Sequence, residues 1–258
     1  GGFTLGTSSG VNPSSSSNMV SWNWKAGTTV SNSNGSITSS VSANTTAGFS
    51  IVSYTSSYSG TPSVGHGLGQ KPDLILAKKR TGAANWGGYS SALTSLYKIN
   101  LNLTSASATT NQWADTEPTS SVFYLPAGGD AETNETPATY IAYCFASIDG
   151  YSKVGSYTGN GNNDGTFVYT GFRPAFVLLE SSSASNDWIL QDNKRDTYNA
   201  VGHYLRPNTS DAELDEDSID FLSNGFKLRT TSGARNTSSE TYIYLAFAES
   251  PFKTANAR

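Results

Sequence analysis

The side chains that most often carry out catalysis or bind metal ions are scarce in this sequence. Its 258 residues include two histidines and one cysteine. His66 lies in the glycine-flanked stretch VGHGLGQKP, and His203 lies in VGHYLRP. Metal centres usually draw on several His, Cys, Asp or Glu ligands, so neither histidine predicts a metal site. We expect His66 to be a hydrogen-bonding turn residue, Cys144 to be a buried small hydrophobe, and the protein to need no cofactor.

Acidic side chains offer another route to chemistry, and the densest run of them is DAELDEDSID at 211–220. Calcium needs a cluster of oxygen ligands, and a glycosidase needs two placed carboxylates. A solvated loop between strands is the simpler interpretation of this run. Because the run has no counterpart elsewhere in the chain, it is also a place where binding could reside. Serines are abundant, but no G-x-S-x-G nucleophile elbow occurs. We therefore predict a protein that is not an enzyme.

An internal repeat organises these residues. TYIAYCFAS at 139–147 returns as TYIYLAFAE at 241–249, a spacing of 241 − 139 = 102 residues. Pro72 and Pro174, and likewise Trp86 and Trp188, keep the same spacing. Self-similarity of this kind indicates a tandem repeat. We predict two units, 48–153 and 154–258, in which the two tryptophans are core or repeat-interface residues and not platforms for a ligand.

The start of the chain resembles the end of a unit. Residues 1–27 align without a gap on 224–250, and eight of the 27 positions are identical. Residues 1–26 are therefore expected to form the last two strands of a truncated upstream repeat. Three interpretations stay open: the chain is part of a longer protein, it is a shortened form of one, or these strands pair with a neighbouring subunit. The polar stretch 27–47 is expected to be a Ser/Thr-rich linker with at most one edge strand.

The pattern within each unit predicts strands. In TYIYLAFA, Ile243, Leu245 and Phe247 alternate with residues that point to the other face, and a period of two with β-branched and aromatic residues is typical of a strand. Short apolar runs separated by segments such as GNGNNDG repeat this signal along the chain. We predict an all-β fold of tandem antiparallel β-sandwich repeats, jelly-roll-like or lectin-like, of about 100 residues each.

Recognition of a ligand without covalent chemistry is the function that this composition favours. Sugar binding typically uses aromatic faces together with polar side chains, and the chain is rich in Tyr, Asn, Asp and Ser. Trp113, an aromatic residue specific to one unit, the segment 193–206 and the acidic run are the places to search for a binding surface, and a structural role for Trp113 stays open. The candidate ligand-binding residues are Trp113, Lys194, Arg195, Tyr198, His203 and Tyr204.

The overall composition excludes two classes of partner. Net charge is −4, and no cluster of Lys and Arg is large enough to neutralise nucleic-acid phosphates. No stretch approaches the roughly 18 apolar residues of a membrane span, so membrane insertion is not expected. Charged residues make up only 14%, so solubility must come from Ser, Thr, Asn and Gly, a surface common in extracellular and virion proteins.

Several stretches carry a resemblance to a known group of proteins. WNWKAG at 22–27, VGHGLGQKPDLILAK at 64–78 and YIAYCFASIDGYSKVGSYTGNG at 140–161 are the main ones. They resemble a repeat-bearing β-rich module of tail-fibre-like virion structural proteins from marine bacteriophages and cyanophages. The resemblance spans nearly the whole chain and implies no catalytic residues.

The resemblance implies an exposed virion appendage, a tail fibre or a capsid-attached fibre, that attaches to a host-surface glycan or protein. It also implies contacts with other virion proteins and self-association, with a homotrimer expected as in tail fibres. Weak single sites would gain avidity from several copies on one particle. A purely structural capsid-decoration or tail-assembly subunit is the alternative. A polysaccharide depolymerase is a third and minor possibility.

Overall fold

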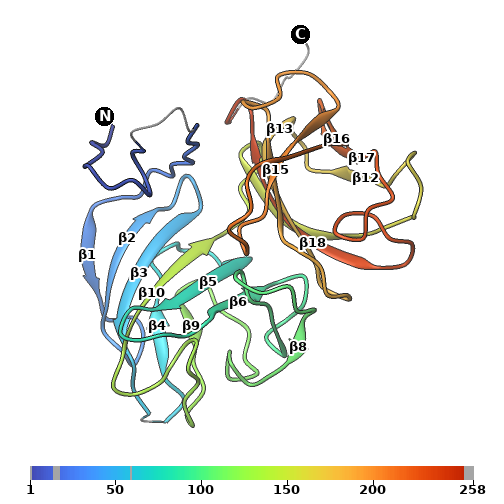
Figure 1. Cartoon of the computed structure of the whole chain (residues 1–258). Helices are drawn as coiled ribbons and strands as arrows, with labels where there is room; N and C mark the ends of the chain where they lie inside the picture. The colour runs from blue at the N-terminus through green and yellow to red at the C-terminus, as the bar shows by residue number, and fades with distance from the viewer. Residues whose placement is uncertain (1, 14–17, 59, 253–258) are drawn as a thin grey trace.

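The computed structural model describes residues 2–13, 18–58 and 60–252 and is all-β (Figure 1). Within these residues there are strands, turns and loops but no helix, and every paired strand is antiparallel to its neighbours. The predicted all-β antiparallel fold is therefore confirmed. None of the described segments is a helix of the kind that could cross a membrane.

The first unit is built on a six-stranded sheet with the order β1-β2-β3-β10-β5-β6. A short two-stranded sheet, β4-β9, lies beside it, and β7 pairs with β8 separately. Fully buried side chains such as Val52, Ile75 and Phe123 form the core of this unit. The strands are β1 (Thr29–Asn32), β2 (Ser39–Asn44), β3 (Phe49–Thr55), β4 (Ser63–Gly65), β5 (Leu74–Lys79), β6 (Trp86–Ser90), β7 (Tyr97–Lys98), β8 (Ala108–Thr109), β9 (Val122–Tyr124) and β10 (Thr139–Phe145).

The second unit is one eight-stranded sheet with the order β11-β18-β13-β14-β15-β16-β17-β12. The sheet curls around its own core, which contains Val177, Ile219 and Phe226. The strands are β11 (Ser152–Thr158), β12 (Phe167–Tyr169), β13 (Pro174–Ser181), β14 (Ile189–Asp192), β15 (Val201–Leu205), β16 (Leu214–Leu222), β17 (Gly225–Leu228) and β18 (Thr241–Ala248).

Strands β3 to β10 recur in order as β11 to β18, and the same internal contacts recur with them. Tyr54 stacks on Tyr140 with ring centroids 5.3 Å apart, and Tyr157 stacks on Tyr242 at 5.1 Å. The Tyr54 hydroxyl donates to the carbonyl of Thr133, and the Tyr157 hydroxyl donates to that of Arg235, which is 102 residues further on. The repeat seen in the sequence is thus a repeat of hydrogen bonds as well as of strands.

The predicted linker at 27–47 is wrong for most of its length. Residues 29–44 form a hairpin, in which β2 pairs with the outer edge of β3 and β1 pairs with β2. Two apolar side chains anchor it, because Ile37 and Val41 are 8% and 1% exposed in the core of the first unit. The hairpin was not recognised in the sequence because serines and threonines occupy most of its positions and only a few apolar residues mark its buried face.

The two strands predicted within 1–26 are also absent from the described part of that segment, since the first strand begins at Thr29. Positions 1 and 14–17 lie outside the described residues. Residues 18–26 run without strand pairing over the boundary between the units, where Trp24 contacts Phe49, Phe145, Phe176 and Phe247 at ring distances of 5.4 to 6.4 Å. These residues pack against an aromatic surface and do not pair with the edge of a sheet.

The two units lie side by side, the first in blue to green and the second in yellow to red (Figure 1). They pack through the same face of the repeated sheet. Phe145 and Phe247 are equivalent by the 102-residue spacing, and their rings contact each other at 6.2 Å. Contact between equivalent residues is the signature of an approximate two-fold relation between the units. A third apolar cluster, which includes Phe49, Leu74 and Phe176, fills this boundary.

Candidate functional site

A polar groove of about 880 Å³ crosses one side of the second unit. One wall is β15 with the loop that precedes it, another is the segment 210–213, and residues 18–22 from the start of the chain form the third. The groove is lined by Asn18, Met19, Val20, Trp22, Arg195, His203, Leu205, Ser210, Asp211, Ala212 and Glu213.

Arg195 is held rigidly in this groove. Its Nε donates to Asp192 at 2.8 Å, its Nη1 donates to Glu213 at 2.8 Å, and its Nη2 donates to the carbonyl of Leu190 at 3.2 Å. Its guanidinium carbon lies 5.8 Å from the ring centre of Trp22, within cation–π distance. A guanidinium has five N–H donors, so these three contacts leave donors for a ligand. The side chain is therefore set in place before any ligand arrives.

His203 is the titratable group of the groove. Its Nδ1 donates to Asp196 Oδ1 at 2.7 Å, and its Nε2 lies 4.0 Å from Asp215 Oδ2. The hydrogen bond with Asp196 is the main reason that the pKa of His203 is raised above 6.5, with Asp215 and Glu213 adding to it. Burial would raise the pKa of Asp196, but hydrogen bonds from the amides of His203 and Gly202 and from the imidazole outweigh it and lower that pKa.

From residue 214 onward the acidic run is a strand, whereas the sequence favoured a solvated loop for the whole run. Residues 214–222 form β16, and Asp215 lies opposite His203 in the β15–β16 ladder. A Cβ on Gly202 would come within 2.3 Å of Asp215 Oδ1, so the glycine lets these acidic side chains lie against β15. Acidic residues tolerate a strand here because their side chains remain exposed along 215–217. Within the described residues, no group of three or more His, Cys, Asp or Glu side chains is placed to hold a metal ion.

The structure brings together some of the predicted binding residues. Arg195 and His203 both line the groove, and Lys194 and Tyr198 are exposed on the loop between β14 and β15, where Tyr198 is 84% exposed. Tyr204 is only 6% exposed and faces the core, with the Arg235 guanidinium 4.2 Å from its ring centre. Tyr204 therefore supports the groove from behind and does not line it.

Trp113 is wrong as a surface candidate. It is 1% exposed in the core of the first unit, where its indole nitrogen donates to the carbonyl of Gly88 at 3.1 Å. Its ring also meets the edges of Tyr89 and Phe123. A tryptophan specific to one unit fills a core that is likewise specific to that unit.

His66 and Cys144 have the surroundings that the sequence led us to expect. Nδ1 of His66 accepts the amide of Leu68, and its Nε2 faces the carbonyl of Thr119 at 3.2 Å. Burial lowers the pKa of His66, and burial raises the pKa of the Cys144 thiol to about 12. Neither residue is poised for chemistry at neutral pH.

Several groove residues were not among the predicted binding residues. Trp22 was expected to be part of a strand, and Asp211 and Glu213 were named only as members of the acidic run. The acidic run at 211–220 carried the available signal, since it is specific to one unit. Trp22 gave no such signal, because its contact with Arg195 joins distant parts of the chain.

The groove combines an aromatic ring, a fixed guanidinium, an imidazole and exposed carboxylates. This set presents donors and acceptors at close spacing beside one apolar face, which suits a ligand that carries many hydroxyl groups.

The chain matches the family described as Domain of unknown function (DUF7483) over residues 1–251. No curated protein and no solved structure matches the chain. The match covers nearly the whole sequence, and the chain therefore belongs to the DUF7483 family.

Proposed function

We propose that this protein is a non-catalytic attachment module that binds a glycan on a cell surface through the polar groove. The observation that carries the proposal is the arrangement of Arg195, which is fixed by three hydrogen bonds and keeps unused donors beside the ring of Trp22. A preorganised donor next to an aromatic face lowers the entropy cost of binding a polar ligand.

The surrounding groups complete the chemistry of recognition. His203 Nε2 and the carboxylates of Asp211 and Glu213 offer donors and acceptors to sugar hydroxyls, and Ser210 adds a hydroxyl. No bond needs to be made or broken for this function. We assign these residues to binding and none of them to catalysis.

The place of the protein on a virus particle rests on the sequence resemblance. The stretches at 22–27, 64–78 and 140–161 resemble tail-fibre-like virion proteins, which supports an exposed appendage, tail fibre or capsid-attached fibre, as the setting. Self-association, with a trimer expected, and contacts with other virion proteins belong to the same proposal. Several copies on one particle would turn a weak groove into firm attachment.

A purely structural role is the second candidate, and one observation favours it. Apolar side chains near the start of the chain are exposed, with Phe3 at 62% and Met19 at 57%. Apolar residues left open in this way are typical of surfaces that another protein covers. In that case the chain would be a capsid-decoration or tail-assembly subunit.

The test is binding of the purified, labelled chain to intact candidate host cells, with and without periodate oxidation of their surface sugars. The proposal predicts saturable binding that periodate abolishes and that Arg195→Ala weakens about tenfold or more. Lys194→Ala is the matched control, because the neighbouring exposed side chain does not line the groove. Binding to no cells, together with assembly of the chain onto particles that lack fibres, would favour the structural role instead.

A further inference from the structure

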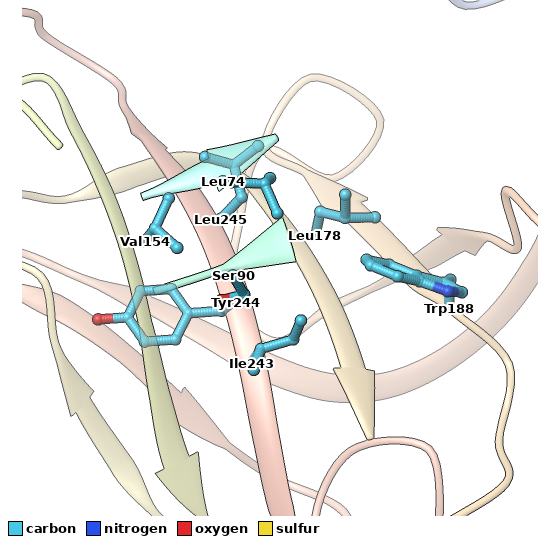
Figure 2. Close-up of a pocket in the computed structure, with 8 residues that line it drawn as sticks. All are labelled: Leu74, Ser90, Val154, Leu178, Trp188, Ile243, Tyr244 and Leu245. Carbon is cyan, nitrogen blue, oxygen red and sulfur yellow. The ribbon is translucent and has the colours of Figure 1, made fainter. Parts of the chain in front are cut away.

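The boundary between the units holds two equivalent sites, one closed and one open. The closed site is a cavity of about 10 Å³, room for little more than one water molecule. Figure 2 shows side chains from both units around it, with Trp188 at one end and Val154 and Tyr244 at the other. It is lined by Leu74, Ser90, Val154, Leu178, Trp188, Ile243, Tyr244 and Leu245.

The open site is the counterpart of that cavity under the approximate two-fold relation. Strand registers pair β10 with β3 and β5 as they pair β18 with β11 and β13, which fixes the equivalences. The equivalents of Leu74, Val154, Leu178, Trp188 and Leu245 are Phe176, Ile51, Leu76, Trp86 and Tyr143, and all five of these line a single groove of about 430 Å³. We call it the open groove.

One contact explains why only one of the two sites is closed. Trp188 is 2% exposed, because its indole nitrogen donates to the carbonyl of Asn100 in the first unit at 3.1 Å. The side chain of Asn102 accepts the backbone amide of Trp86, and the side chain of Asn208 accepts that of Trp188, so the two asparagines are equivalent. Arg206 and Asn100 each precede their asparagine by two residues and are therefore equivalent too. The counterpart of the Asn100 carbonyl is the Arg206 carbonyl, which accepts the backbone amide of Thr209 at 3.1 Å.

The Arg206 side chain forms ion pairs with Asp187 and Asp211 in its own unit, each 3.3 Å long. Among the described residues none accepts a hydrogen bond from the indole nitrogen of Trp86, and the Trp86 side chain stays half-buried. In the closed site the tryptophan ring is buried and its N–H is hydrogen-bonded within the protein. In the open groove the equivalent ring is half-buried and its N–H has no acceptor among the described residues.

We propose that the open groove binds a ring of a neutral saccharide. Trp86 and Tyr143 stack at 6.1 Å with an angle of 28° between their planes, so the pair lines the groove with aromatic rings against which the C–H face of a sugar can pack. The indole nitrogen of Trp86 supplies the donor that a hydroxyl or ring oxygen would accept. No carboxylate lines the open groove, so a cationic ligand finds no ion-pair partner there. Its volume lies in the range of small-molecule sites.

The same sheet face extends the site beyond one ring. Cross-strand partners form a row from Ser31 through Ser40, Ser53, Ile141 and Lys78 to Trp86. Six strands about 4.8 Å apart make this row roughly 24 Å long. A second shallow groove of about 320 Å³ covers its hydroxyl-bearing end and is lined by Ser31, Thr38, Ser39, Ser40, Ser53, Tyr54, Thr55 and Thr139. The ligand is therefore a linear oligosaccharide that runs from Trp86 toward β1.

This site is separate from the polar groove around Arg195 and His203. Trp22 lines both grooves, but the proposal for the open groove rests on Trp86, Tyr143 and the row of serines, none of which lines the polar groove. The hairpin that supplies Ser31 and Ser40 exists only beside the first unit, so the second unit has no copy of this row. Evidence against one of the two binding sites therefore does not count against the other.

The test is a tryptophan-fluorescence and calorimetric titration of the full chain with cellohexaose, laminarihexaose and maltohexaose. We expect at least one hexasaccharide to bind saturably, Trp86→Ala to weaken it about tenfold or more, and Trp86→Phe to weaken it less. The phenylalanine keeps the ring and loses the N–H, and it guards against misfolding of the alanine variant. The double variant S40A/S53A should weaken the hexasaccharide several-fold but leave a monosaccharide unaffected.

Arg195→Ala separates the two proposals, because it should leave hexasaccharide binding unchanged while it lowers attachment to cells. Two results would overturn the proposal for the open groove. One is no binding of any of the three hexasaccharides at millimolar concentration. The other is binding that Trp86→Ala and Trp86→Phe leave unchanged in folded protein.

Discussion

The indole nitrogen of Trp188 donates a hydrogen bond to the carbonyl oxygen of Asn100, 3.1 Å away and on the other side of the boundary between the two units. Trp86, its equivalent in the first unit, has no such acceptor among the described residues. The repeat gives both units the same tryptophan, and the packing of the units uses only one of them. The other is left at the surface, beside Tyr143 and at the end of a row of serines.

This difference predicts unequal costs for the same substitution. Trp188→Ala removes a fully buried ring and a hydrogen bond, so it should lower the free energy of unfolding by about 3–5 kcal/mol. Trp86→Ala removes a half-buried ring at the rim of a groove, and we expect a loss of about 1 kcal/mol. Chemical denaturation followed by circular dichroism measures both. Equal losses would show that the two sites are packed alike.

A second prediction concerns His203 and its partner. Asp196→Asn removes the charge that holds the raised pKa of His203, so the pKa should fall toward 6.5. Since the folded pKa is the raised one, the stabilisation by this pair is complete below pH 6.5 and is lost as pH rises through the folded pKa. An NMR titration of the imidazole in both proteins measures the shift. An unchanged pKa in the variant would mean that Asp196 does not control it.

A third prediction concerns Glu180, which is 1% exposed on β13 and has one carboxyl oxygen without a hydrogen-bond partner. Burial, with a contribution from Asp187, raises its pKa to about 9. Between pH 4.5 and 9 the folded protein holds a proton that the unfolded chain releases, so stability falls as pH rises across this window. Glu180→Gln cannot ionise and should flatten this dependence.

At pH 8 the glutamine variant should be more stable than the native protein by about 1–3 kcal/mol. Denaturation at pH 6 and pH 8.5 with both proteins is the measurement. Parallel pH profiles of the two proteins would rule out Glu180 as the cause.

A fourth prediction tests the repeat itself. Asn134 and Asn236 are both fully buried and 102 residues apart, and the side-chain amide of each donates to backbone carbonyls, of Pro126 and of Thr230 respectively. Replacement of either by alanine should lower the free energy of unfolding by about 2–3 kcal/mol, because backbone groups lose their partners. The two variants should give similar values by thermal or chemical unfolding. A large difference between the two losses would show that the equivalent contacts do not stabilise the two units equally.

The strands were predictable where the side-chain alternation is strong. TYIAYCF at 139–145 and TYIYLAFA at 241–248 are β10 and β18, and each is paired with a strand on both sides. The hairpin at 29–44 was not predictable in this way, because only Ile37 and Val41 mark its buried face among serines and threonines. The strand pattern of 18–26 failed for the opposite reason: the pattern is present, but these residues lie against the aromatic boundary between the units and pair with no strand.

The candidate site was predictable only in part. The segment 193–206, which carries Arg195 and His203, was singled out from the sequence, and both residues line the polar groove. Trp113 does not lie at the surface, since a residue specific to one unit can as well fill the core of that unit. Trp22 required the tertiary structure, because its role depends on a contact with a distant residue.

The most direct test of the account is to follow both histidines by NMR while adding the surface polysaccharide purified from cells that bind the labelled chain. His203 lines the polar groove, whereas His66 is fully buried in the first unit and serves as an internal control. The account predicts saturable shifts of the His203 imidazole signals with the His66 signals unchanged. Saturable binding of the polysaccharide that leaves His203 unchanged would contradict the assignment of the polar groove as the glycan site.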